Sequence, residues 1–143
     1  PFAVTTHIKD MAVQETATGF LLAEVPLGEG ILDLPQMFAL FEKYNPQIDY
    51  HLEMITRDPL DIPCLKPTYW ATFPDKPGTE LARTLAMVRE RKAEKMPKTS
   101  GLNLEAALEF EETNIVKCLR EAGEKYGFTP SLKPKAAGKK DEH

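Results

Sequence analysis

Two short stretches of hydrophobic positions, one at the start of the chain and one near residue 50, predict two β-strands. Residues 4–8 are apolar and β-branched, which is typical of a strand buried on both faces. Residues 48–55 alternate apolar and polar positions, the period of a strand whose two faces differ. Between them we expect a loop over residues 10–18 and only a short extended piece over residues 20–25.

Amphipathic spacing predicts one helix between these strands and two helices after them. The first helix is capped by Asp33 and carries apolar positions at helical spacing as far as Tyr44. A strand, a helix and a second strand form a βαβ unit, and such units make parallel pairs with right-handed crossovers. The later helices are expected over about residues 79–95 and 104–126, after an ordered, Pro-rich segment at 59–78.

Composition and charge narrow the class of protein. With 42% hydrophobic and 28% charged residues, the 143-residue chain has the profile of a soluble globular protein. The formal net charge of −4 offers no broad basic face for a phosphate backbone, and no apolar run approaches the roughly 20 residues of a membrane span. We therefore expect neither a nucleic-acid nor a membrane partner. Cys64 and Cys118 fit no metal or redox spacing and are expected to be reduced.

Two parallel strands alone leave both sheet edges and both faces uncovered, so the chain is expected to be part of something larger. It also begins without Met, inside an apolar stretch, which suggests that an upstream segment is missing. We expect residues 1–58 to carry the strands, residues 59–128 to form a loop and helical extension, and residues 129–143 to be a disordered basic tail. The expected compartment is the cytoplasm.

Candidate chemistry lies at the ends of the two predicted strands. His7 is near the end of the first, and Glu53 is near the end of the second. A carboxylate in an apolar strand is costly to bury unless it is paired, which favours a functional role for Glu53. Because the carboxyl ends of parallel strands meet at one edge of the sheet, we expect His7 and Glu53 to lie together. Both side chains are suitable ligands for a divalent metal ion.

Three segments in this order resemble the final third of the xylose isomerase-like TIM barrels, which include sugar phosphate isomerases and epimerases. They are His7-Ile8-Lys9-Asp10, Leu27-Gly28-Glu29-Gly30 and Leu52-Glu53-Met54-Ile55. The resemblance covers about residues 3–58. It implies an α/β fold comprising about the last two strands of a (β/α)8 barrel, followed by C-terminal helices.

The resemblance also implies roles for individual residues. His7 and Glu53 would bind a divalent ion (Mn²⁺, Mg²⁺, Co²⁺ or Zn²⁺), and Glu53 would also be the proton-transfer base. Lys9 would face the pocket and bind the substrate, or else order the loop that follows. Asp10 would order a loop, or form hydrogen bonds that support the two metal ligands.

Two further residues are placed by their position in the sequence. Arg57, just beyond the second strand, is a candidate for binding an anionic group of the substrate, with a solvated loop arginine as the alternative. His51 shares a strand face with Glu53 and is a candidate for supporting it, with a satisfied core histidine as the alternative.

The resulting hypothesis is a divalent-metal-dependent isomerase or epimerase acting on a sugar or sugar phosphate by carboxylate-mediated proton transfer next to a carbonyl. One alternative is a non-catalytic fragment or association module, because a TIM barrel takes about 250 residues and catalytic zinc sites usually have three protein ligands. On that ground we expect the isolated chain to be incomplete and inactive, and to associate with missing barrel strands or with itself. An endonuclease IV-like phosphodiesterase fits less well, because Leu22-Ala23-Glu24 stands where such enzymes carry an Asp-x-His.

Overall fold

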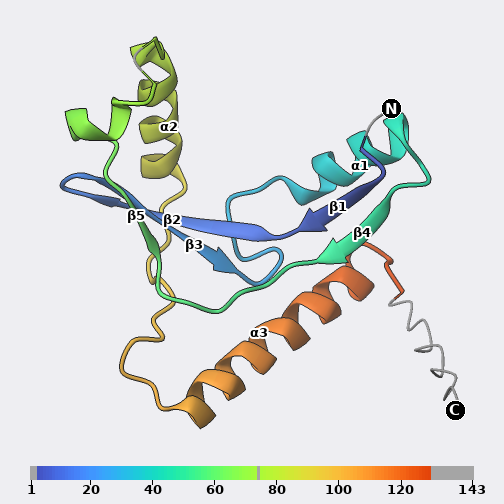
Figure 1. Ribbon diagram of the computed structural model, residues 1–143. Helices are drawn as coiled ribbons and strands as arrows, with labels where there is room; N and C mark the ends of the chain where they lie inside the picture. The colour runs from blue at the N-terminus through green and yellow to red at the C-terminus, as the bar shows by residue number, and fades with distance from the viewer. Residues whose placement is uncertain (1–2, 74, 130–143) are drawn as a thin grey trace, which may run out of the picture.

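The computed structural model describes residues 3–73 and 75–129 (Figure 1). In those residues a parallel pair is formed by β1 (Thr5–Ile8) and β4 (Asp49–Leu52). The pairing places His7 opposite His51. The prediction that the two strands pair in parallel, with a helix between them in the sequence, is therefore confirmed. The first strand is exposed on one face rather than buried on both, and the second ends at Leu52 rather than at residue 55. The predicted disordered tail falls almost entirely on residues 130–143, which lie outside the described ranges.

A separate antiparallel sheet has the strand order β2–β3–β5, with β2 at Asp10–Thr16, β3 at Gly19–Val25 and β5 at Leu60–Ile62. The prediction of a loop over residues 10–18 is wrong, since most of that stretch is β2. Gly19 closes the tight connection between β2 and β3 with a φ of 152°, and a Cβ there would collide with the carbonyl oxygen of Ile62 in β5. Glycine therefore allows the third strand to approach.

The prediction of a TIM-barrel portion is contradicted by this topology. In a (β/α)8 barrel each strand is followed by a helix. Here only Lys9 separates β1 from β2, and the chain then folds back on itself as an antiparallel hairpin before any helix begins. In the described residues the strands make one two-stranded and one three-stranded sheet, and neither closes into a barrel.

Within the described ranges, three α-helices pack on these sheets. Helix α1 (Leu34–Tyr44) begins at Asp33, whose side chain accepts a hydrogen bond from Gln36 N. Helix α2 spans Gly78–Glu90, after a short 3-10 turn at Pro67–Trp70. Helix α3 (Leu104–Glu124) is capped by Asn103. No helix in the described ranges is both long and apolar enough to cross a bilayer.

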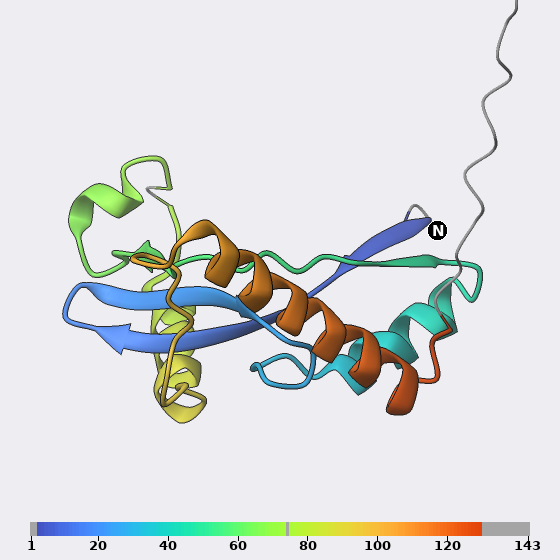
Figure 2. The same ribbon diagram turned by 90° about the horizontal axis from the view of Figure 1, so that it is seen from below.

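The described part of the chain has two hydrophobic core clusters. One lies between the antiparallel sheet and α2 and contains Val13, Phe20, Cys64, Leu85 and Val88. The other joins the parallel pair to α1 and α3 and contains Ile8, Leu27, Leu34 and Cys118. In the view from below, α3 runs beneath the strands towards the end of α1 (Figure 2). This packing leaves the other face of the β1–β4 pair free for polar side chains.

Candidate functional site

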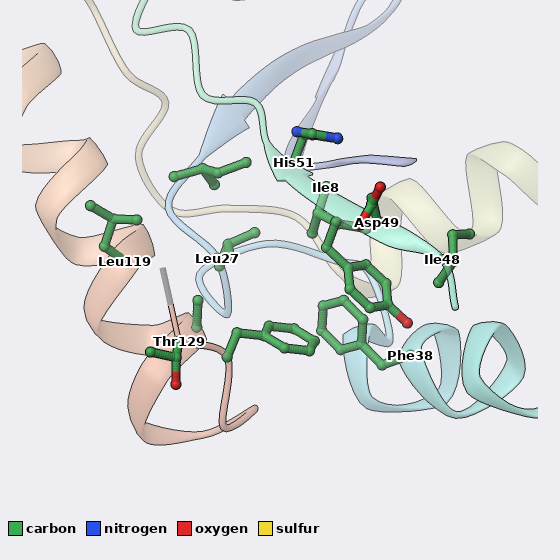
Figure 3. A pocket seen from close by; sticks show the side chains of 12 residues that line it. Ile8, Leu27, Phe38, Ile48, Asp49, His51, Leu119 and Thr129 are labelled. Atoms are coloured by element: carbon green, nitrogen blue, oxygen red, sulfur yellow. The ribbon is translucent and has the colours of Figure 1, made fainter. Parts of the chain in front are cut away.

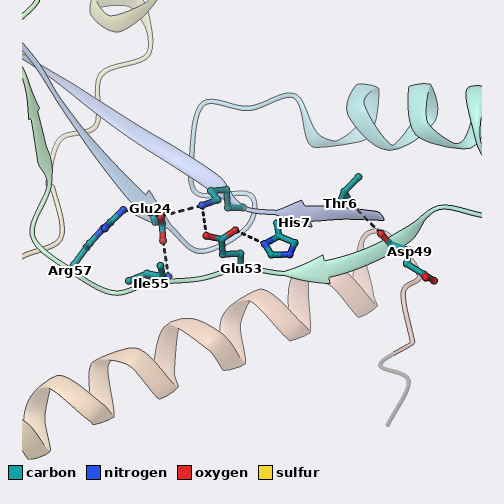
Figure 4. A network of polar contacts seen from close by, with 8 residues as sticks. Thr6, His7, Glu24, Asp49, Glu53, Ile55 and Arg57 are labelled. Carbon is teal, nitrogen blue, oxygen red and sulfur yellow. Dashed lines mark hydrogen bonds and ion pairs between the residues drawn. The ribbon is translucent and has the colours of Figure 1, made fainter. Parts of the chain in front are cut away.

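The parallel pairing brings His7 and Glu53 into contact. His7 lies opposite His51, and Glu53 is two residues further along, so its side chain lies on the same face. The backbone N–H of Glu53 donates to Ile8 O at 2.9 Å, which continues the ladder just past β4. His7 Nδ1 and Glu53 Oε2 are 2.9 Å apart (Figure 4). The predicted juxtaposition at the strand ends is thus present.

Lys9 occupies the next position on this face. Its Nζ donates to Glu53 Oε1 at 2.8 Å and to Glu24 Oε1 at 3.4 Å. Lys9 therefore bridges two carboxylates, one from the end of the parallel pair and one from β3. About a third of the Lys9 side chain and of the Glu53 side chain remains exposed.

Glu24 is the buried member of the polar cluster that contains Lys9 and Glu53, and it holds its cationic partners in place. Its side chain is only 3% exposed. One carboxylate oxygen accepts from the backbone N–H of Ile55 at 2.8 Å, and the other receives both Lys9 and Arg57 Nη2, the latter at 3.3 Å. A buried carboxylate is stable only when paired, and these three donors pair it.

The charges shift the proton affinities of the two exposed partners. The hydrogen bond from Lys9, followed by that from His7, holds the pKa of Glu53 below its ordinary value. This hydrogen bond, which Lys9 donates and Glu53 accepts, is also the main reason that the pKa of Lys9 is raised, against a smaller opposing effect of burial. Glu53 is therefore a carboxylate and Lys9 an ammonium at neutral pH.

Asp10 is placed away from His7 and Glu53, in a backbone-binding role. It is 1% exposed, and its carboxylate accepts hydrogen bonds from the N–H groups of Met11, Gly28, Gly30 and Leu32. A Cβ on Gly30 would collide with this carboxylate. Asp10 thus orders the loop between β3 and α1, one of the two roles expected of it.

His51 is exposed rather than a core residue, and among the described residues its side chain makes no hydrogen bond to Glu53. Its ring meets that of His7 edge-on, with centroids 6.0 Å apart. It also lies at a mostly apolar pocket of about 470 Å³ beneath β4, between α1 and α3 (Figure 3). That pocket is lined by residues such as Phe38 and Leu119, and not by His7, Lys9 or Glu53.

His7 and Glu53 together would form only part of a metal site, which is called the half-site below. His7 and Glu53 supply one imidazole nitrogen and one carboxylate, a donor pair that suits a first-row divalent ion. Within residues 3–73 and 75–129 no group of three or more His, Cys, Asp and Glu side chains is placed to hold a metal. The remaining ligands of such an ion would be water, substrate or donors from another molecule.

Glu24 is the residue that the sequence interpretation missed. The signal was available, because Glu24 is a charged residue in the otherwise apolar run of residues 20–25. Its partners, however, become visible only once β3 is placed against the segment that follows β4.

Comparisons with protein-family models, with curated proteins and with solved structures found no match to this chain.

Proposed function

We propose that the His7–Glu53 pair is a divalent-metal half-site that serves isomerisation or epimerisation of a sugar or sugar phosphate by proton transfer next to a carbonyl. The observation that carries the proposal is the 2.9 Å contact between His7 Nδ1 and Glu53 Oε2 at the carboxyl ends of two adjacent parallel strands. The choice of a sugar and the role of Glu53 as proton-transfer base both rest on the resemblance of the three sequence motifs, and the geometry supports the meeting of the two proposed metal ligands.

Glu53 has the properties of the base. It is ionised at neutral pH, although the hydrogen bonds that lower its pKa also reduce its basicity, and part of its side chain is accessible to a substrate. One carboxylate can take a proton from one carbon and return it to the neighbouring carbon, which isomerises the sugar. Epimerisation requires an acid on the opposite face as well. A divalent ion bound at the half-site would supply Lewis-acid polarisation of the carbonyl and of an adjacent hydroxyl.

His7 and Lys9 position this base from two sides. His7 contacts one oxygen of Glu53 and Lys9 the other, so the carboxylate is held in one orientation. His7 is exposed enough for its ring to reach an ion, its side chain being 66% accessible. Positioning of this kind fixes which oxygen faces a substrate.

The proposal is tested by calorimetric titration with Mn²⁺ of the wild-type chain and of the His7→Ala, Glu53→Ala double variant. We expect the double variant to bind at least about tenfold more weakly, which corresponds to ~1.4 kcal/mol of binding free energy. His51→Ala is the matched control, because it removes a neighbouring imidazole that does not contact Glu53, and it should bind Mn²⁺ as the wild type does. Equal affinity in the wild type and the double variant would exclude the half-site.

Proton transfer is tested separately by NMR in D₂O, with Mn²⁺ and a panel of ketoses and ketose phosphates. Because the isolated chain is expected to be inactive, any deuterium that enters the carbon next to a sugar carbonyl and is lost in Glu53→Gln would support Glu53 as the base. Exchange that persists in Glu53→Gln would rule out Glu53 as the base.

A further inference from the structure

Two cations share one oxygen of a buried carboxylate at the edge of the candidate site. Lys9 Nζ and Arg57 Nη2 both contact Glu24 Oε1, at 3.4 and 3.3 Å. The other oxygen of Glu24 is held by the backbone N–H of Ile55. Glu24 is thus fixed, and it sets the spacing of the two cations.

Both cations keep free donors towards solvent. The side chain of Arg57 is 47% exposed and that of Lys9 is 31% exposed, whereas Glu24 behind them is almost fully covered. A guanidinium has five N–H donors and an ammonium three. The contacts to Glu24 and Glu53 use only some of them, so an anion can approach from the open side.

We infer that Lys9 and Arg57, held by Glu24, form an anion subsite for the phosphate of a phosphorylated sugar, and that filling it strengthens metal binding at the His7–Glu53 half-site. This inference rests on the proposed function and names the substrate class for it. Arg57 and Lys9 provide the donor geometry that phosphate oxygens prefer.

The coupling follows from the charge balance of the cluster. Lys9 and Arg57 carry two positive charges, and Glu24 and Glu53 carry two negative charges. A phosphate dianion alone would leave an excess of two negative charges, and a divalent ion alone would leave two positive charges. Both together restore the balance, so each favours the other, and by linkage the effect is reciprocal.

Lys9 links phosphate binding to metal binding, because it contacts a carboxylate oxygen that both events affect. In the structure its ammonium donates a hydrogen bond to Glu53 Oε1, an oxygen that would otherwise be available to a metal ion. A phosphate that attracts Lys9 releases this oxygen. Lys9 is therefore a positioning residue that competes with the metal ion in the absence of phosphate and stops competing in its presence.

The test measures Mn²⁺ affinity by calorimetry in the presence of fructose or of fructose 6-phosphate. The phosphorylated sugar should tighten Mn²⁺ binding by roughly tenfold, within the usual range of coupling between sites. Fructose should have little effect. In Lys9→Met and in Arg57→Gln the tightening should be lost, and Lys9→Met should bind Mn²⁺ more tightly than the wild type when no sugar is present.

Arg89→Gln is the control, since it also breaks an Arg–Glu pair, the 2.8 Å contact of Arg89 with Glu15 elsewhere on the surface. It should retain the full tightening, and a titration of Mn²⁺ into the sugar phosphate without protein corrects for their binding in solution. Circular dichroism confirms that each variant is folded. Equal effects of the two sugars, or unchanged tightening in Lys9→Met, would overturn the inference.

Failure of the anion subsite is distinguishable from failure of the half-site. If Mn²⁺ binding depends on His7 and Glu53 but ignores phosphate, only the subsite is wrong. If no Mn²⁺ binds, a ³¹P NMR titration of the metal-free protein with fructose 6-phosphate decides: a shift lost in both Lys9→Met and Arg57→Gln supports the subsite. No shift, or one kept by those variants, removes it.

Discussion

Two buried carboxylates, Asp10 and Glu24, lie close in the fold but have different surroundings. Asp10 receives only backbone N–H groups, four of them, and contacts no cation among the described side chains. Glu24 receives one backbone N–H and two cations whose other donors face solvent. The first is therefore suited to fixing a loop, and the second to organising groups that can bind a ligand.

Replacing Asp10 by Asn should destabilise the protein by about 2–3 kcal/mol. An amide nitrogen would then face backbone N–H groups of Gly28 and Gly30, or of Met11 and Leu32, and leave buried donors without acceptors. The measurement is urea unfolding followed by circular dichroism. Asp33→Asn is the matched control, because Asp and Asn cap helices equally well and its cost should be small. Equal losses in both variants would contradict this account of Asp10.

At the scale of elements, the sequence predicts structure best where one face of an element sets a clear period. The helix starting after Asp33 and the helix over residues 104–124 have such faces, and both are present close to their expected bounds. The helix expected over residues 79–95 ends at Glu90, because Ala93 N donates to Val13 O in β2 rather than to its own helix.

The antiparallel hairpin could not be recognised in the same way. The stretch Asp10–Thr16 contains a buried Asp and a buried Ala, which carry little strand propensity, and its burial does not alternate cleanly. The candidate site could likewise be predicted from the sequence only in part. The meeting of His7 with Glu53 depends on two strands with clear patterns, whereas the approach of Glu24 depends on the hairpin.

Asp58 connects two segments that are far apart in the sequence. Its carboxylate accepts from Thr99 N at 2.6 Å, Ser100 N at 2.9 Å and Thr99 Oγ1 at 3.2 Å. These hydrogen bonds, that of Ser100 N foremost, lower the pKa of Asp58 to about 2. The contacts fix the loop between α2 and α3 to the segment that follows β4.

The stabilisation from Asp58 should therefore depend on pH in the acidic range. Because the folded-state pKa is depressed, this contribution is fully present above the unfolded pKa of about 3.9 and is lost as pH falls towards 2. Urea midpoints measured between pH 6 and pH 2 should fall less steeply for Asp58→Asn than for the wild type. Asp61→Asn, at an exposed position in β5, is the control. If the urea midpoint of Asp58→Asn fell with pH as steeply as that of the wild type, the assignment of this stabilisation to Asp58 would be contradicted.

At the scale of the whole molecule, the two hydrophobic clusters share no residue but are linked by the backbone. Only Lys9 separates Ile8, in the cluster beneath the parallel pair, from β2, which contributes Val13 to the other cluster. Asp10 ties the start of β2 to the loop that precedes α1. Loss of β1 would remove the support at the start of β2, so the two clusters are expected to unfold together.

The single tryptophan makes this cooperativity measurable. Trp70 packs against the cluster of the antiparallel sheet, and its Nε1 donates to Cys64 O at 2.8 Å, so its fluorescence reports on that half alone. Ile8→Val, in the other cluster, should cost about 1 kcal/mol. If the molecule unfolds as one unit, this substitution lowers the urea midpoint by the same amount in Trp70 fluorescence and in far-UV circular dichroism. Val116→Ala, at a half-exposed position on α3, should move neither midpoint.

A Trp70 midpoint that stays fixed while the circular dichroism midpoint falls would show that the halves unfold separately. The link through β1 and β2 would then be too weak to couple the candidate site to the antiparallel sheet that carries Glu24.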